Sequence, residues 1–257
     1  MNLLAFISEA SFYNFLYVWI GLALLIFPIN LFITAPYGRH TKQNWGPMIS
    51  NRWGWVVMEL PALLSYPILF YLGTSQKSIV AWVFVIFWLV HYINRTLIFP
   101  FRQRTKGKQM PLLIAVMGIC FNFGNGFSLG WFQGNLGSYE LDWLFDFRFY
   151  LGVSLFLGGM YINWQSDHIL LNLRRPGESG YKIPEGGLFN YISCPNHLGE
   201  IIEWIGFAMM TWSLAGLSFA IWTAANLIPR ALSHHKWYQE HFENYPKSRK
   251  AVIPGVL

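Results

Sequence analysis

Two carboxylates, Glu200 and Glu203, stand three residues apart in the otherwise apolar segment CPNHLGEIIEWIGF at residues 194–207. In an α-helix this spacing places both carboxylates on one face. Together with the preceding Asn196, they offer acceptor oxygens that can receive hydrogen bonds from a ribose or an amide, although Glu203 could also simply pair with an arginine. Because an ionisable group inside a bilayer costs about 2.5–3.5 kcal/mol unless it is paired or solvated, the two acids indicate a functional site.

Polar groups interrupt other apolar segments in the same way. Glu59 lies in MELPALL and is followed by Pro61, which removes a backbone donor and loosens that turn. The string HYINRT places His91 and Arg95 one helical turn apart, with Tyr92 on the adjacent face. Taken singly, a buried glutamate is a structural group about as often as a functional one, and a lone histidine is more often a core residue than a ligand.

A third set of polar groups leads into basic residues. In NWQSDHILLNLRR, Asn163, Asp167 and Arg174 share one helical stripe, and the later segment RALSHHKWYQEHFENYPKSRK is rich in Arg, His and Tyr. Arginines near a membrane boundary are, by themselves, usually topology signals or headgroup contacts. Together these polar groups predict a large cavity that opens to the cytoplasm, and its arginines fit an anion with several phosphates.

Familiar nucleotide and metal motifs do not explain this cavity. The string GNGFSLG at residues 124–130 lacks the spacing of a Rossmann turn, and we expect it to mediate close helix packing instead. His234, His235 and His241 lack an HExxH-like arrangement. We therefore expect no metal.

The elements that position these residues are membrane-spanning helices. The chain has 257 residues, of which 54% are hydrophobic, 19% aromatic and only 12% charged, a composition that excludes an ordinary soluble domain. Its apolar runs are long enough to cross about 30 Å of hydrocarbon. They cover residues 12–33, 53–72, 79–99, 111–132 and 149–171, and a longer run at 198–228 is divided by a turn at 212–218. We predict an all-α, multi-pass integral membrane protein with seven transmembrane helices.

The distribution of Lys and Arg predicts the orientation of these helices. Nearly all basic residues fall in loops on one side, whereas Lys77 and Arg148 fall on the other side and Arg95 lies inside a span. Because cytoplasmic loops carry the excess of basic residues, the N-terminus is expected to be outside or lumenal and the C-terminus cytoplasmic. The same bias accounts for the net charge of +6, so no nucleic-acid partner is expected.

Several strings resemble the steroid 5α-reductase family, the NADPH-dependent 3-oxo-5α-steroid 4-dehydrogenases of endomembranes, which also have bacterial homologues. The strings are MELPALL, HYINRT, GNG, NWQSDHILLNLRRPGE, YKIPEGGLFNYISCPNHLGEIIEWIGFA and YPKSRKAVIP. The resemblance extends from about Tyr37 to the C-terminus and is most specific in the C-terminal half. It implies one transmembrane reductase domain over residues 1–257, in which residues 1–132 mainly bind steroid and residues 133–257 mainly bind NADPH.

The resemblance also implies roles for individual residues. Glu59 and Tyr92 would be the catalytic residues that hold the C3 ketone of a Δ4-3-oxosteroid. The residues implied to contact NADPH are Tyr37, Arg95, Asn163, Asp167, Arg174, Tyr181, Asn196, Glu200, Arg230, His234 and Tyr238. Glu200 would accept hydrogen bonds from the cofactor or order Asn196, whereas Glu203 would lie behind the cofactor contacts.

These residue types suit an oxidoreductase that acts on a CH–CH group, here the C4=C5 bond conjugated to the C3 ketone. Hydride addition at C5 builds negative charge on the ketone oxygen, and donors aimed at that oxygen stabilise the transition state more than the ground state. Tyr92 can donate its phenolic proton. Glu59 either donates, if burial keeps it protonated, or orients Tyr92. The expected product is the 5α-dihydrosteroid, and the sequence does not assign the acid that protonates C4.

Two departures from the family pattern affect these expectations. Met58 stands where mammalian steroid-reducing members have Gln, which bears on substrate preference more than on reaction type. The loop RQRTKGKQM is longer than the family pattern, so no cofactor contact is carried over to Lys106 or Lys108.

Other functions stay open at this point. The alternatives are a reductase of another lipid, such as an enoyl thioester or a polyprenol intermediate, a membrane enzyme that uses S-adenosylmethionine, and a non-enzymatic lipid or solute carrier. The lack of an internal repeat and of paired broken helices disfavours the carrier. For the favoured enzyme we expect a monomer in contact with membrane lipid, in the endoplasmic reticulum of a eukaryote or the cytoplasmic membrane of a bacterium.

Overall fold

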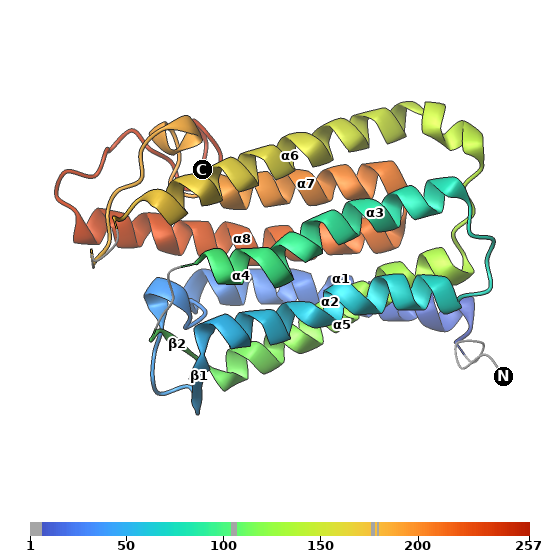
Figure 1. The fold of residues 1–257 in the computed structure, drawn as a ribbon, viewed down its shortest axis with the longest axis horizontal. Helices are drawn as coiled ribbons and strands as arrows, with labels where there is room; N and C mark the ends of the chain where they lie inside the picture. The colour runs from blue at the N-terminus through green and yellow to red at the C-terminus, as the bar shows by residue number, and fades with distance from the viewer. Residues whose placement is uncertain (1–6, 104–106, 176–177, 179) are drawn as a thin grey trace.

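Long helices run side by side in an elongated bundle whose connections lie at its two ends (Figure 1). The computed structural model describes residues 7–103, 107–175, 178 and 180–257. The long helices are α1 (Glu9–Phe32), α2 (Asn51–Leu72), α3 (Ile79–Ile93), α5 (Leu112–Asn135), α6 (Phe147–Asn172), α7 (Pro195–Thr211) and α8 (Leu214–His241). A π-helical turn (Asn94–Ile98) joins α3 to the short α4 (Phe99–Arg102), and β1 (Met48–Ser50) pairs antiparallel with β2 (Gln109–Pro111).

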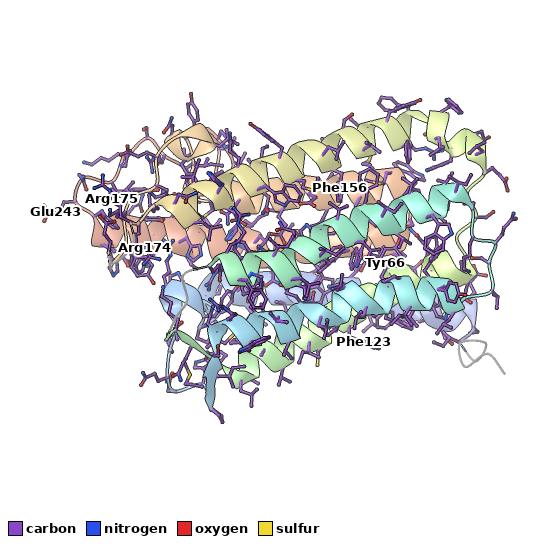
Figure 2. The ribbon with its side chains drawn as sticks, in the orientation of Figure 1. Tyr66, Phe123, Phe156, Arg174, Arg175 and Glu243 are labelled. Carbon is purple, nitrogen blue, oxygen red and sulfur yellow. The ribbon has the colours of Figure 1, made fainter. Side chains whose placement is uncertain are left out.

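Four helical segments among the described residues are long and apolar enough to cross a membrane. They are Glu9–Phe32, Asn51–Leu72, Ile79–Arg102 and Leu112–Asn135. Many of their large apolar side chains face outward, as expected for lipid contact, and Figure 2 shows Phe123 on the outer side of the bundle. The prediction of an all-α membrane protein is confirmed. The helices α6, α7 and α8 match the remaining predicted spans in position, and their crossing of the membrane stays a prediction.

The turn between the last two helices is shorter than predicted. It was expected over residues 212–218, but α7 ends at Thr211 and α8 begins at Leu214. Trp212 adopts a left-handed conformation with φ of 42°, which reverses the chain at once. Ser213 then caps α8 by accepting a hydrogen bond of 3.0 Å from the Gly216 amide, so the helix starts within the segment expected to be loop.

Glycines let the helices of two pairs approach closely. In the α2–α5 pair, a side chain at Gly126 would overlap with Ser65, and one at Gly130 would meet the backbone of Tyr66. The expected packing role of the GNGFSLG string is therefore confirmed. In the α6–α7 pair, a Cβ atom at Gly159 would overlap with the backbone of α7. Large aromatic residues fill the space between the pairs, and Figure 2 shows Tyr66 and Phe156 inside the bundle.

The two ends of the bundle differ in charge. The α1–α2, α4–α5 and α6–α7 connections and the C-terminal tail lie at the end that holds β1 and β2 (Figure 1). The described basic residues at this end are Arg39, Lys42, Arg52, Arg102, Lys108, Arg174, Arg175, Lys182, Arg230, Lys236, Lys247, Arg249 and Lys250. Lys77 and Arg148 lie at the opposite end, while Arg104 and Lys106 are outside the described residues. Because successive long helices run in opposite directions, the basic connections gather at one end of the bundle, as the sequence predicts.

Adjacent glycines on α6 provide a test of the close packing. Gly159 abuts the backbone of Gly199 and Glu203, whereas a methyl group added at Gly158 would meet nothing within 4 Å. Gly159→Ala should lower the free energy of unfolding by about 1–3 kcal/mol, because the helices must separate. Gly158→Ala should be neutral or slightly stabilising, since Ala favours helix more than Gly. Thermal unfolding in detergent measures both, and equal midpoints for the two variants would contradict this packing.

Candidate functional site

A cavity of about 530 Å³ opens at the basic end, between the segment after α1, the α3–α4 junction and the ends of α6, α7 and α8. Its volume falls within the range of about 300–1,000 Å³ that is usual for small-molecule and cofactor sites. Most of the predicted cofactor residues line it, namely Tyr37, Arg95, Asp167, Arg174, Tyr181, Asn196, Glu200, Arg230 and His234. Residues far apart in the sequence thus share one cavity, as the sequence predicts.

The Arg95 guanidinium lies between two acids on different helices. Its Nη1 is 3.7 Å from Asp167 Oδ2 on α6, and its Nη2 is 3.9 Å from Glu200 Oε2 on α7. The π-helical turn presents Arg95 to the cavity, and the guanidinium packs over the rings of Trp55 and Phe99 at 5.1 and 4.8 Å. These ion pairs are longer than hydrogen bonds, so Arg95 balances the charge of both acids and leaves their oxygens able to accept from a ligand.

Asparagines join the same two helices beside this ion pair. Asn163 Nδ2 on α6 donates a hydrogen bond of 3.0 Å to the backbone oxygen of Asn196, in the first turn of α7. Asn196 Nδ2 lies 3.5 Å from Asp167 Oδ1, a long contact that leaves the Asn196 amide available to a ligand. Asn163 is buried behind Asn196 and is not one of the lining residues. From this position Asn163 can fix the backbone of Asn196.

A cation that the sequence reasoning missed, Arg39, lines the opposite side of the cavity. Its Nη2 donates to Tyr238 Oη at 3.1 Å, and its guanidinium lies 4.4 Å from the Tyr238 ring centroid and 4.9 Å from that of Trp237. Its Nη1 is buried and has no hydrogen-bond partner among the described residues. Tyr238, which the resemblance implies as a cofactor contact, is not among the lining residues and supports Arg39. The signal in the sequence was the YGR string, in which Gly38 takes the positive φ of 64° that turns Arg39 toward the cavity.

Arg230 anchors the segment that carries Arg39. Its Nη1 donates to the Ala35 oxygen at 2.6 Å and its Nη2 to the Tyr37 oxygen at 2.8 Å, while the guanidinium stacks 3.9 Å from the Tyr37 ring centroid. Both of these bonds use charged donors, which form the stronger class of hydrogen bond. Arg230 therefore holds the cavity wall in addition to lining it.

Lys108 also lines the cavity, although no contact was carried over to it from the family pattern. Its Nζ lies 5.9 Å from the Tyr181 ring centroid. Burial lowers the pKa of Lys108, and the positive charges of Arg174 and Arg39 lower it further. This side of the cavity therefore has an excess of positive charge that an anionic ligand would relieve. Lys106 lies outside the described residues.

Histidines close the inner wall beside the two arginines. His40 Nε2 lies 3.0 Å from His234 Nδ1 with the rings stacked, and His197 packs on His234 with 5.7 Å between ring centroids. Burial, followed by the charges of Arg230 and Arg39, lowers the pKa of His40 to about 4. Within the described ranges, no group of three or more His, Cys, Asp or Glu side chains is arranged to hold a metal.

The predicted catalytic residues adjoin the cavity at Arg95 without being among its lining residues. Glu59 is half-buried on α2 and lies within electrostatic reach of Arg95 and Glu200. Tyr92 is buried against Trp88, with 4.4 Å between ring centroids, and lies within electrostatic reach of Glu59. The cavity and this acid–phenol pair thus meet at one arginine.

Within the described part of the chain, Glu203 forms no salt bridge with an arginine, although such a pair was one interpretation of the sequence. Its Oε1 lies 2.8 Å from His91 Nδ1, and both side chains are almost fully buried. This pair links α7 to α3 one residue before Tyr92. His91 is accordingly a core histidine with a partner, as a lone histidine was expected to be.

Comparisons with known proteins identify the family of the chain. A family model described as 3-oxo-5-alpha-steroid 4-dehydrogenase matches residues 108–257. The chain is 44% identical over 254 residues to a steroid 5-alpha-reductase DET2 of Solanum lycopersicum, which covers 97% of this chain and 98% of the relative. The chain belongs to the 3-oxo-5-alpha-steroid 4-dehydrogenase family.

Animal relatives in the same family are similarly close. The chain is 42% identical to a 3-oxo-5-alpha-steroid 4-dehydrogenase 1 of Bos taurus, over 94% of this chain and 95% of the relative. It is 43% identical to the protein of the same name in Homo sapiens, over 94% of this chain and 93% of the relative. As a member of this family the chain is an oxidoreductase that acts on CH–CH groups.

The lowered pKa of His40 predicts a dependence of stability on pH. In the unfolded chain His40 has its ordinary pKa near 6.5, whereas in the folded chain the pKa is about 4. Between these values the unfolded state binds more protons, so stability falls as the pH drops from 6.5 toward 4. His40→Gln, which can still bond to His234, should reduce this loss.

The measurement is the unfolding midpoint in detergent at several pH values between 4 and 7. His168→Gln is the matched control, because His168 is an exposed histidine on α6. A pH dependence that is the same in both variants would show that His40 does not carry the effect.

Proposed function

We propose that this protein catalyses the NADPH-dependent reduction of the C4=C5 bond of a Δ4-3-oxosteroid to the 5α-dihydro product. The observation that carries the proposal is the arrangement around Arg95. This residue lines a cavity that has a cationic wall and an acid–amide wall, and it also adjoins the acid–phenol pair of Glu59 and Tyr92. The names of the relatives support the choice of substrate, since they are a steroid 5-alpha-reductase and 3-oxo-5-alpha-steroid 4-dehydrogenases.

The residues of the cavity fit a phosphorylated nicotinamide nucleotide. The buried Nη1 of Arg39 has no partner among the described residues, and Arg39, Lys108 and Arg174 line one side of the cavity together, so these three cations suit phosphates. Asp167, Asn196 and Glu200 on the other side suit ribose hydroxyls and a carboxamide.

The remaining lining residues and their supports complete the proposed cofactor site. Tyr37, Tyr181, Arg95, Arg230 and His234 form its walls. Asn163 and Tyr238 act through Asn196 and Arg39. When bound, NADPH supplies the hydride that is added at C5 of the steroid.

Glu59 and Tyr92 carry the chemistry at the ketone. In the proposed reaction Tyr92 donates a hydrogen bond to the C3 oxygen, where negative charge develops, and Glu59 either donates to it as well or orients Tyr92. The surroundings of Tyr92 exclude water, because its side chain is buried and packs against Trp88 and Trp204. In such a site a fixed donor stabilises the developing charge more than it would in water.

The proposal includes the topology. The chain crosses the membrane seven times, with the basic end and the C-terminus in the cytoplasm and the N-terminus outside or lumenal. Residues 1–132 mainly bind steroid, and residues 133–257 mainly bind NADPH. We further propose a monomer, in the endoplasmic reticulum of a eukaryotic cell or the cytoplasmic membrane of a bacterium.

The decisive experiment is NADPH consumption by the detergent-purified protein with progesterone, testosterone or androstenedione. Mass and stereochemistry identify the product, and a 5α-dihydrosteroid is expected. Cofactor binding without steroid reduction would favour a reductase of another lipid. Absence of both would favour a carrier.

Substitutions at the ketone site should separate chemistry from cofactor binding. Glu59→Gln and Tyr92→Phe should each lower kcat by about two orders of magnitude or more, which is the scale of losing an oxyanion-stabilising donor. NADPH affinity should be nearly unchanged. Tyr71→Phe, at an exposed tyrosine on α2, is the control and should keep normal turnover. Normal turnover by Tyr92→Phe would refute the assigned ketone site.

Substitutions at the cavity should instead weaken NADPH binding. Arg39→Ala, Arg174→Ala and Asn196→Ala should each raise the Kd for NADPH by about 10- to 100-fold, as expected for a lost hydrogen bond to a charged group. Lys236→Ala serves as the control, because Lys236 is an exposed cation at the same end that pairs with Glu240. Binding is measured by nucleotide fluorescence. Equal affinities for Arg39→Ala and Lys236→Ala would exclude Arg39 from the site.

A further inference from the structure

One amide of α5 bonds to the turn of α2 that carries the proposed catalytic acid. Asn122 is 4% exposed, and its Nδ2 donates to the Met58 backbone oxygen at 2.6 Å and to Glu59 Oε2 at 3.3 Å. A primary amide has two N–H donors, so both bonds can form at once. Bonding to the backbone fixes the amide, and the fixed amide then fixes one oxygen of Glu59.

The packing of the two helices explains how so short a side chain reaches both groups. Gly118 and Gly126 lie one turn before and one turn after Asn122, on the same face of α5. A Cβ atom at Gly118 would lie 2.8 Å from Met58 Cβ, and one at Gly126 would overlap with Ser65 Oγ. The side chains of Met58 and Ser65 on α2 therefore fill the space left by these two glycines of α5, and Asn122 sits between these close contacts.

The bond from Asn122 distinguishes the two oxygens of Glu59. Because an N–H donates to Oε2, that oxygen acts as an acceptor, and in the neutral carboxyl the proton is then carried by Oε1. Glu59 is half-buried, so the carboxyl keeps an accessible side. A carboxyl held in this way presents a donor to a ketone, and rotation that would exchange the two oxygens breaks the bond to Asn122.

We propose that Asn122 is a positioning residue, which holds Oε2 of Glu59 as an acceptor so that Oε1 carries the proton offered to the C3 ketone oxygen. This role rests on the proposed steroid reduction. It selects proton donation by Glu59 over the alternative that Glu59 only orients Tyr92. Asn122 itself touches neither substrate nor cofactor in this scheme.

Infrared spectroscopy tests the hydrogen bond without any ligand. The carboxylic-acid C=O band of Glu59 is identified by its loss in Glu59→Gln, using detergent-solubilised full-length protein. In Asn122→Leu the band should move to higher wavenumber, because the acceptor oxygen loses its donor. Asn125→Leu is the matched control. Asn125 is another buried amide on α5, bonded to Trp19, and its substitution should leave the band in place. Absence of the band in the wild type, or an unmoved band in Asn122→Leu, would overturn the proposal.

Kinetics test the consequence of that hydrogen bond. Asn122→Leu and the closer isostere Asn122→Asp should lower kcat by about 10- to 100-fold, with much smaller changes in the steroid KM and the NADPH Kd. In a Glu59→Gln background, Asn122→Leu should add little, because the group it positions is gone. An equal further loss in that background would show a merely structural effect and overturn the proposal.

These experiments distinguish a failure of the proposed function from a failure of the proposed role of Asn122. NADPH binding by each variant shows that it is folded. If the wild type reduces no steroid, the proposed function fails, while the infrared result still decides whether Asn122 fixes the Glu59 carboxyl. If the wild type reduces steroid and the band does not move, only the role of Asn122 fails.

Discussion

The ion triad of Arg95, Asp167 and Glu200 is the constraint around which this bundle is organised. Three charged groups, from the π-helical turn after α3 and from α6 and α7, meet in a protein whose helices are mainly apolar. None of them could remain there alone, because an uncompensated buried charge costs several kcal/mol. The separations of 3.7 and 3.9 Å compensate the charges without saturating the acceptors, so the triad both holds the three helices together and stays receptive to a ligand.

The rest of the structure makes this triad possible by fixing the helices around it. The α2–α5 and α6–α7 pairs are held at close approach by glycines, and α3 lies between them, bonded to α7 through His91 and Glu203. The π-helical turn then rotates the chain after α3 so that Arg95 faces the cavity, while Tyr92 stays in the aromatic core. A ligand site in a membrane bundle thus depends on backbone contacts that carry no chemistry of their own.

The sequence predicted those parts of the fold and site that depend on local pattern. Long apolar runs located the helices, and the small residues of GNGFSLG indicated close helix packing, although not which helix is the partner. Polar groups in apolar segments predicted that a cavity exists, because such groups are expensive there, whereas the family resemblance implied which individual residues line it. Arg39 and Lys108 were missed for the opposite reason: both lie in polar connections, where a cation is unremarkable by itself. Only the folded chain shows that Tyr238 and Trp237 hold Arg39 over the cavity.

The partners of Glu203 and Glu59 show why tertiary pairing could not be predicted from spacing. Glu203 shares a helical face with Glu200, yet its partner is His91, more than a hundred residues away on another helix. Met58, in turn, is an apolar residue where the resemblance leads to an amide, which suggests that Glu59 has lost a hydrogen-bonding neighbour. Met58 packs with Met110 and Ile114 instead. An amide nevertheless reaches Glu59, from Asn122 on α5. The proposed chemistry requires a hydrogen-bond donor beside the Glu59 carboxyl. Because α2 and α5 pack closely, either helix can supply that donor. Loss of the amide at position 58 therefore does not remove the means to orient the acid.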